Sequence, residues 1–207
     1  MKGRRNPFVA REGLPFLLTS LVLLLVAWNL GGWPYALPIA LFSVWLFCIF
    51  RDPRRPIPPA PLGVVSPVDG TAIEVGTVDC GAEHGDVQRI LIRVDSFGPY
   101  TARCPAEGTV MDLSCNLPDG QPDVSSSGLW MRTDEGADVL LQFHGHRFGL
   151  APRAFARYGE RIGQGQRCAY LRLTRVAEVR VPRDSRVLVE PGQRVRAGAD
   201  LIARLAP

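Results

Sequence analysis

Few residues of this 207-residue chain combine a reactive side chain with a setting that chemistry would need. Asp69 is the first candidate, because a carboxylate in the stretch Ser66-Pro-Val-Asp-Gly70 can take part in acid–base catalysis or orient a catalytic base. Asp-Gly is also a common turn pair whatever the chemistry, so a turn role explains the same aspartate. Which of these two roles Asp69 has depends on the side chains that the fold brings near it.

Other polar groups have structural explanations that compete with functional ones. The serine run 125–127 is flanked by Pro, Asp and Gly, which is typical of a polar loop. His144 and His146 would share one face of an extended segment, but a metal pair needs a third ligand, and the acids at 134–138 are near only in sequence. His84, between glycines, is explained as a loop residue. We therefore predict no metal site.

An uncharged stretch from residue 14 to residue 50 is the first element that must position these groups. It breaks near Gly31, Gly32 and Pro34 into apolar segments of 20 and 17 residues, against the roughly 20 that a spanning helix needs. A signal peptide would have a shorter apolar region and a small-residue cleavage site. The stretch predicts an α-helical membrane hairpin of two short spans, with a re-entrant hairpin as the alternative.

Basic residues lie on both sides of this hairpin. They are Lys2, Arg4, Arg5 and Arg11 in the segment 1–13, and Arg51, Arg54 and Arg55 after the hairpin. Because positive charge favours the cytoplasmic side, we predict that both ends face the cytoplasm. The chain would then be a cytoplasmic domain anchored on the inner membrane.

The segment 51–62 is a proline-rich linker. Proline fixes φ and cannot continue a helix, so we expect a stiff and extended connector. Such a connector would hold the following domain close to the bilayer, which suits an enzyme whose substrate is in the membrane. A plain spacer would have the same composition.

Residues 63–207 show short apolar runs separated by Gly, Pro and Asp, which predict strands. The runs are Val64–Val65, Thr71–Val75, Ile90–Val94, Val139–Phe143, Cys168–Leu173, Val176–Val181, Val187–Val189 and Leu201–Leu205. Only Pro152–Tyr158 is compatible with a short helix. The segment therefore predicts one mainly β domain of short strands.

An internal repeat refines this prediction. The segments Gly159–Gly165 and Gly192–Gly198 share the pattern G-x-R-[IV]-x-x-G. The glycines allow the positive φ of tight turns, and the Ile or Val would pack inward. The pattern resembles the turn of lipoyl and biotinyl carrier domains, but Lys2 is the only lysine, so no swinging-arm cofactor is expected. We expect a barrel-sandwich-like β architecture.

The net charge of +4 conceals a segregation of charge along the chain. Residues 1–60 carry +5, residues 61–146 carry −9 and residues 147–207 carry +8, with arginine as the only basic residue of the last block. Such a block can bind nucleic acid, contact anionic lipid headgroups, or pair with the acidic middle of the domain. Since no nucleic-acid-binding motif accompanies it, we predict no nucleic-acid partner and expect internal pairing together with a membrane-facing surface.

The five cysteines are odd in number, widely spaced and without a C-x-x-C motif. This pattern argues against a disulfide framework and against a zinc site. It is typical of reduced thiols in a cytosolic domain.

Several motifs together resemble the short form of the phosphatidylserine decarboxylase family. They are Arg-Glu-Gly-Leu-Pro-Phe at 11–16, the hairpin, Phe50-Arg-Asp-Pro-Arg-Arg55, Ser66-Pro-Val-Asp-Gly70, the segment 165–182 and Gly192–Gly198. The resemblance covers nearly the whole chain. It implies a proenzyme in which a serine of a Gly-Ser step cuts the chain and leaves a pyruvoyl group. That group would decarboxylate phosphatidylserine to phosphatidylethanolamine.

The resemblance also implies roles for four positions. Asp69 matches the family's catalytic aspartate, which with a histidine activates the serine. The histidine position corresponds to Tyr100, and the Gly-Ser step to Thr174-Arg175. Arg175 has no hydroxyl and stays protonated, and a tyrosine is a poor general base at neutral pH. Thr174 offers a hydroxyl one residue early, which would give a ketobutyryl group instead of a pyruvoyl group.

We therefore expect a membrane-anchored family member of phospholipid metabolism without self-cleavage and without a cofactor. Its expected partners are membrane phospholipids with anionic headgroups, which Arg175 would contact, and a homo- or hetero-oligomer with a related protein is compatible with the sequence. One alternative is an active phosphatidylserine decarboxylase that makes phosphatidylethanolamine. Another is a non-enzymatic β module that binds lipid or protein.

Overall fold

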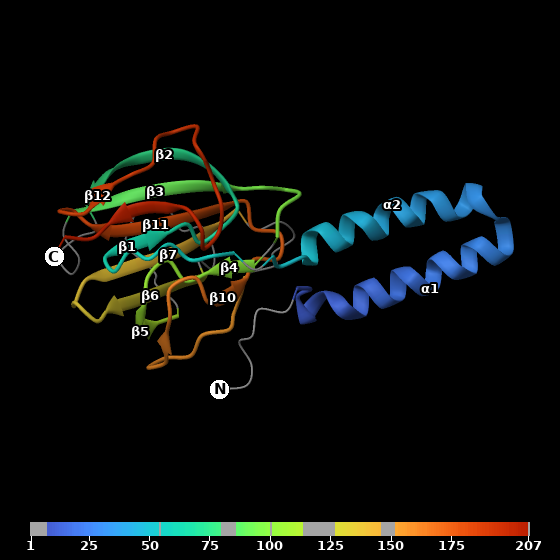
Figure 1. Ribbon diagram of the computed structural model, residues 1–207, viewed down its shortest axis with the longest axis horizontal. Helices are drawn as coiled ribbons and strands as arrows, with labels where there is room; N and C mark the ends of the chain where they lie inside the picture. Colours follow the sequence, from blue (N-terminus) through green and yellow to red (C-terminus); the bar gives the residue numbers. More distant parts are fainter. Residues whose placement is uncertain are drawn as a thin grey trace. The chain divides into compact units, whose positions relative to one another are not determined.

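The computed structural model describes residues 8–53, 55–79, 86–99, 101–113, 127–145 and 152–206. It divides into two compact units: one contains the N-terminal helices and the segment Phe97–Pro99, and the other contains the rest of the chain from Arg55. The described fold is mainly β and follows an N-terminal helical pair (Figure 1), which confirms the predicted fold class.

The first unit is a helical hairpin. A short 3-10 helix, η1 (Arg11–Gly13), leads into α1 (Leu14–Gly31), and α2 (Trp33–Phe50) follows. Gly32 joins the two helices with a φ of 67°, a conformation that side chains disfavour. Both helices are long and apolar enough to cross a membrane, and most of their side chains are exposed, as expected where lipid replaces a protein core.

Hydroxyl groups inside the hairpin are satisfied by the helix that carries them. Thr19 donates to the Pro15 carbonyl oxygen at 2.9 Å, and Ser43 donates to the Ile39 carbonyl oxygen at 2.8 Å. Such internal bonds remove the need for water, so these polar residues are compatible with a lipid environment.

The second unit is built from antiparallel strands. They are β1 (Gly63–Val65), β2 (Gly70–Asp79), β3 (Asp86–Val94), β4 (Thr101–Arg103), β5 (Gly108–Asp112), β6 (Ser127–Thr133), β7 (Asp138–His144), β8 (Arg153–Ala154), β9 (Arg161–Ile162), β10 (Arg167–Tyr170), β11 (Val176–Pro182), β12 (Arg186–Val187), β13 (Arg194–Val195) and β14 (Leu201–Arg204). The largest sheet has the order β13-β2-β3-β11-β7-β6-β5-β9, and two smaller sheets have the orders β1-β14-β12 and β4-β10-β8. In Figure 1, β2, β3, β11, β7, β6 and β5 lie side by side in this order.

The two faces of the large sheet differ in chemistry. Ile90, Val179 and Leu141 are cross-strand neighbours on one face, and all three are fully buried. The alternate face carries charged residues, including the neighbouring Glu178 and Arg180 of β11, which are also buried. The apolar face forms the core, and the buried charges of the other face require partners.

The predicted glycine repeat is confirmed. Gly159 and Gly165 have φ values of 72° and 69°, and their counterparts Gly192 and Gly198 have values of 90° and 70°. Ile162 and Val195, the apolar residues between the glycines, are both buried. The repeat 159–165 contributes β9 to one end of the large sheet, and the repeat 192–198 contributes β13 to the other end.

A second internal repeat, which was not predicted from the sequence, pairs with the first. Ser66-Pro-Val-Asp-Gly70 (the Asp69 turn) corresponds to Cys104-Pro-Ala-Glu-Gly108 (the Glu107 turn). Gly70 pairs with Val195 of β13, and Gly108 pairs with Ile162 of β9. The two halves of the domain therefore repeat one structural unit.

Backbone hydrogen bonds follow the same correspondence. The matching pairs are Gly198 N–Ser66 O (2.8 Å) with Gly165 N–Cys104 O (2.9 Å), Val65 N–Pro105 O (2.8 Å) with Arg103 N–Pro67 O (2.8 Å), and Gly192 N–Ala72 O (2.7 Å) with Gly159 N–Val110 O (2.9 Å). Because the bonds repeat donor for donor, the two turns share one backbone hydrogen-bonding pattern.

Several sequence-based predictions of elements and their boundaries need correction. Pro152–Tyr158 is not a helix: Arg153 and Ala154 form β8 on β10, and the Phe155 amide donates to the Cys168 carbonyl oxygen at 2.8 Å. Cross-strand pairing thus overrides a weak helical preference. The strand expected at Cys168–Leu173 ends at Tyr170, and the one at Val187–Val189 ends at Val187. The strands β4, β5, β6, β8, β9 and β13 were not predicted, because most of them are too short to show a period.

Candidate functional site

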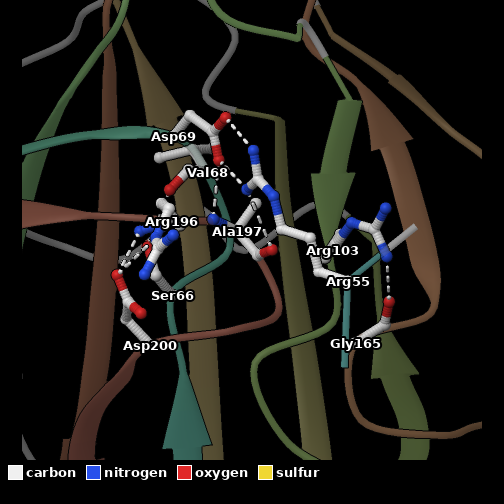
Figure 2. Close-up of polar contacts among 9 residues, drawn as sticks. All are labelled: Arg55, Ser66, Val68, Asp69, Arg103, Gly165, Arg196, Ala197 and Asp200. Atoms are coloured by element: carbon white, nitrogen blue, oxygen red, sulfur yellow. Dashed lines mark hydrogen bonds and ion pairs between the residues drawn. The ribbon is translucent and has the colours of Figure 1, made fainter. Parts of the chain in front are cut away.

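Asp69 lies in the turn between β1 and β2 and binds Arg55, a residue of the proline-rich linker (Figure 2). Arg55 Nη2 donates to Asp69 Oδ2 at 2.7 Å, and Arg55 Nη1 donates to Asp69 Oδ1. The Ala197 amide also donates to Asp69 Oδ1, at 2.7 Å. Since both oxygens accept charge-assisted or backbone bonds, the carboxylate fastens the linker to the glycine turn 192–198.

Neighbouring bonds keep this arrangement in place. Ser66 Oγ donates to the Val68 carbonyl oxygen at 2.7 Å inside the Asp69 turn. Arg103 Nη1 donates to the Gly165 carbonyl oxygen at 3.1 Å, and Asp200 accepts the Arg196 amide at 2.9 Å (Figure 2). The Asp69 turn, β4 and the two glycine turns therefore form one hydrogen-bonded cluster.

Asp69 and Arg175 flank the same end of β3 although the two are far apart in sequence. The Asp95 amide donates to the Asp69 carbonyl oxygen at 2.9 Å, and the Val94 amide donates to the Arg175 carbonyl oxygen at 2.8 Å. Both residues therefore lie beside the end of β3. Of the four positions that the resemblance assigned, Asp69 therefore lies on one side of β3, and Arg175 with the preceding Thr174 lies on the other.

Thr174 and Arg175 differ sharply in exposure. Thr174 is 1% exposed, and its hydroxyl donates to the Leu171 carbonyl oxygen at 2.6 Å. Arg175 is exposed, and its amide donates to the His144 carbonyl oxygen at 3.2 Å. Arg172, just before them, has a φ of 53°, which is unusual for a residue with a side chain. The segment is a tight connection that hides the threonine hydroxyl and presents the guanidinium.

Several candidates of the sequence analysis lie outside the described residues. Tyr100 is one of them, and so are His84, His146 and the serines 125 and 126. The strand β6 begins at Ser127, which is the last residue of the serine run.

His144, by contrast, has a partner that the sequence did not indicate. Its Nε2 lies 2.7 Å from Glu178 Oε2, and Arg180 Nε donates to Glu178 Oε1 at 2.5 Å. Burial raises the pKa of Glu178, but the hydrogen bond with His144 and the charge of Arg180 outweigh it and hold that pKa below its usual value. The sequence offered one signal for this contact, the alternation of side chains along a strand. His144 pairs with Val176, and Glu178 follows two residues later on the same face of β11.

Within the part of the chain that the structure describes, no group of three or more His, Cys, Asp or Glu residues could hold a metal ion. Cys48, Cys104 and Cys168 are free thiols, and the other two cysteines lie outside the described residues.

The arginine-rich block pairs in part with the acidic middle of the domain. Arg183 bonds Asp86 at 2.5 Å, Arg161 bonds Glu107 at 3.1 Å, and Arg194 lies 3.7 Å from Asp95. These contacts are largely exposed, so each stabilises the fold only weakly.

Comparisons with known proteins give sequence relatives over almost the full chain. No family model matches. A phosphatidylserine decarboxylase proenzyme of Nitrosomonas eutropha is 31% identical over 209 residues, covering 96% of this chain and 95% of the relative. Proteins of the same description from Burkholderia ambifaria and Nitrosomonas europaea are 29% and 28% identical, covering 97% and 96% of this chain and 97% and 95% of their own.

A comparison of structures gives a more distant likeness. The glucose permease IIA protein of Mycoplasma capricolum aligns with a TM-score of 0.46 at 18% identity, covering 69% of this chain and 94% of its own.

Proposed function

The chain belongs to the phosphatidylserine decarboxylase family, and from this premise we propose that it is a membrane-anchored member that works without self-cleavage. The observation that supports this most is the pair Thr174-Arg175. Arg175 stands where the resemblance expects the nucleophilic serine, and it has no hydroxyl to attack or eliminate. Thr174 has one, but that hydroxyl is buried and donates to the Leu171 carbonyl oxygen.

The family's pyruvoyl group would have to be made from the residue at position 175. Arginine does not fit this requirement, so we derive no step through such a group. Asp69 supports the same proposal, because its carboxylate binds Arg55 and the Ala197 amide. We propose that it holds the linker and does not activate a nucleophile.

The role that we propose is recognition of an anionic phospholipid headgroup. Arg175 is exposed, and Arg93, the cross-strand partner of the adjacent Val176, is exposed as well. Within the described residues neither side chain forms an ion pair. Each of these exposed guanidinium groups can bind a phosphate or a carboxylate through charge-assisted hydrogen bonds. The basic residues around the hairpin support a cytoplasmic location of this site, at the inner membrane.

The mass of the intact purified protein tests the absence of cleavage. We expect one chain of about 22.7 kDa. The rival function, an active decarboxylase, is favoured by the description of the relatives and would use Thr174 or a rearranged site. Two fragments that divide before Thr174, with a carbonyl group at the new terminus, would establish that rival and contradict our proposal.

Headgroup recognition needs a separate experiment on the full chain in detergent. We expect short-chain phosphatidylserine to bind more tightly than short-chain phosphatidylcholine, and the double variant R93A/R175A to weaken that binding about tenfold or more, or about 1.4 kcal/mol. The matched control is R204A, which removes another exposed arginine. Equal binding of both lipids, or no effect of R93A/R175A, would favour a β module that binds protein instead.

A further inference from the structure

The repeated structure of the β domain relates the Asp69 site to a second place on its surface. Aligning the sequences of the Asp69 turn and the Glu107 turn matches Asp69 with Glu107, and aligning the two glycine turns matches Ala197 with Gln164. Asp69 and Ala197 are the residues that bind Arg55: its guanidinium contacts the Asp69 carboxylate and also lies 3.3 Å from the Ala197 carbonyl oxygen. In this half of the domain, the aspartate of the Asp69 turn and Ala197 of the glycine turn therefore bind a guanidinium group.

In the other half, the corresponding residues line a pocket. The pocket has a volume of about 290 Å³ and is lined by Pro58, Pro59, Ala60, Pro61, Glu107 and Gln164. Gln164 is fixed in place, because its Nε2 donates to the Gly63 carbonyl oxygen at 2.5 Å. The linker prolines give the pocket a stiff apolar wall beside the Glu107 carboxylate. A volume at the small end of the range for ligand sites suits one side chain or a small cation.

Arg161, the one cation with a described contact to Glu107, is not the equivalent of Arg55. It corresponds to Arg194 of the other half and is shared between Glu107, at 3.1 Å, and Asp134. Its side chain is 64% exposed and that of Glu107 is 56% exposed, whereas Asp69 beneath Arg55 is only 13% exposed. An exposed pair of this kind is weak and can be displaced.

We propose that this pocket binds a guanidinium group from outside the chain, presented by an arginine side chain of a partner protein. The Glu107 carboxylate would accept two hydrogen bonds from the planar guanidinium group, and the prolines would pack on the aliphatic part of the arginine side chain. The site is independent of the proposed headgroup site, because it uses neither Arg93 nor Arg175. The failure of one proposal would leave the other standing.

The test measures binding of N-acetyl-arginine amide to the full chain in detergent by ligand-observed NMR. We expect saturable binding that Glu107→Gln weakens about tenfold, or about 1.4 kcal/mol. Arg161→Ala should strengthen binding several-fold, because it removes the competing cation. Glu135→Gln, which removes an exposed carboxylate outside the pocket, is the matched control and should bind as the wild type does.

Each contrary result would overturn the proposal. No binding by the wild type, undiminished binding by Glu107→Gln, or equal losses in Glu107→Gln and Glu135→Gln would show that the pocket does not select a cation. Ethylammonium that competes as well as the arginine derivative would rule out a guanidinium site. Because Arg161→Ala is expected to gain binding, a loss through misfolding cannot imitate the predicted pattern.

Discussion

The Asp69 carboxylate is bound by two groups from distant parts of the chain, the Arg55 guanidinium and the Ala197 amide. The side chains of Asp69 and Arg55 are only 13% and 18% exposed, so water competes little with their bidentate contact. This ion pair therefore stabilises the attachment of the linker more than the exposed arginine–carboxylate pairs stabilise the sheet.

Replacement of this aspartate by its neutral isostere tests that conclusion. We expect Asp69→Asn to lower the free energy of unfolding by about 1–3 kcal/mol, because a charged partner of a shielded guanidinium is lost. Combined with Arg55→Ala, it should add little further loss. Asp95→Asn, which breaks the 3.7 Å exposed contact with Arg194, should cost less than about 0.5 kcal/mol in the same denaturation experiments. Equal losses in the two single variants would refute a special role of Asp69.

Glu178 predicts a pH dependence of stability. Its pKa in the folded protein lies below the ordinary value, although burial raises it, because His144 and Arg180 stabilise the carboxylate. The unfolded chain then binds more protons in this range. The contribution of Glu178 is complete above the unfolded pKa of about 4.3 and is lost as the pH falls through the lower folded pKa.

Denaturation of the wild type and of Glu178→Gln checks this sign. The stability advantage of the wild type should be fully present at about pH 5 and above, and should shrink towards about pH 3. Glu190→Gln, at the surface, should keep the wild-type profile. An advantage that grows as the pH falls would mean that burial controls the pKa of Glu178 and that His144 and Arg180 do not.

Among the elements, β2 is positioned by the close approach of its first residue to β3. A Cβ atom on Gly70 would lie 2.0 Å from the Arg93 carbonyl oxygen, whereas a Cβ atom on Gly76 in the same strand would meet nothing within 4 Å. The Glu107 turn repeats this feature, since a Cβ atom on Gly108 would lie 2.2 Å from the Arg132 carbonyl oxygen. Both turns therefore require glycine for packing, at the point where a strand enters the large sheet.

The two glycines of β2 offer a matched pair of substitutions. Gly70→Ala must move one strand backbone away from the other, and we expect a loss of about 3 kcal/mol or more. Gly76→Ala should be neutral or stabilise the fold by up to about 1 kcal/mol, because it restricts the unfolded chain at no steric cost. Thermal unfolding followed by far-ultraviolet circular dichroism measures both. Similar losses in both variants would show that the close approach at Gly70 does not decide the effect.

For the whole molecule, the two apolar helices raise the question of how the hairpin is placed in a membrane. If α1 and α2 both span, the turn between them reaches the side opposite to the β domain. Leu30, just before the turn, is 85% exposed and is suited to a cysteine probe.

We expect Leu30→Cys to react with a membrane-impermeant maleimide added to the periplasmic side of intact cells. A cysteine at Pro59, in the linker, should react only after the membrane is opened, and the unchanged protein gives the background of its own thiols. Labelling of Leu30→Cys only after opening would show a re-entrant hairpin. That outcome would leave the proposed location of the β domain intact.

The sequence by itself determined the elements whose information is local. An uncharged run with a glycine break gives the hairpin, and repeated glycines give the turns with positive φ at Gly159, Gly165, Gly192 and Gly198. Short apolar runs bounded by Gly, Pro and Asp predicted strands such as β3 and β11. These features follow from the period and length of an apolar segment and from the φ that glycine allows, and a single segment can specify each of them.

Only the tertiary structure decided which side chains meet. Arg55 and Asp69 are 14 residues apart, Asp69 and Ala197 are 128 apart, and His144 and Glu178 are 34 apart. These contacts depend on strand register and on the order of strands in the sheet, and no local pattern encodes either of them. For the same reason, the sequence alone did not predict the short strands beside the Glu107 turn or the pocket at Glu107. Both depend on contacts between the two halves of the domain.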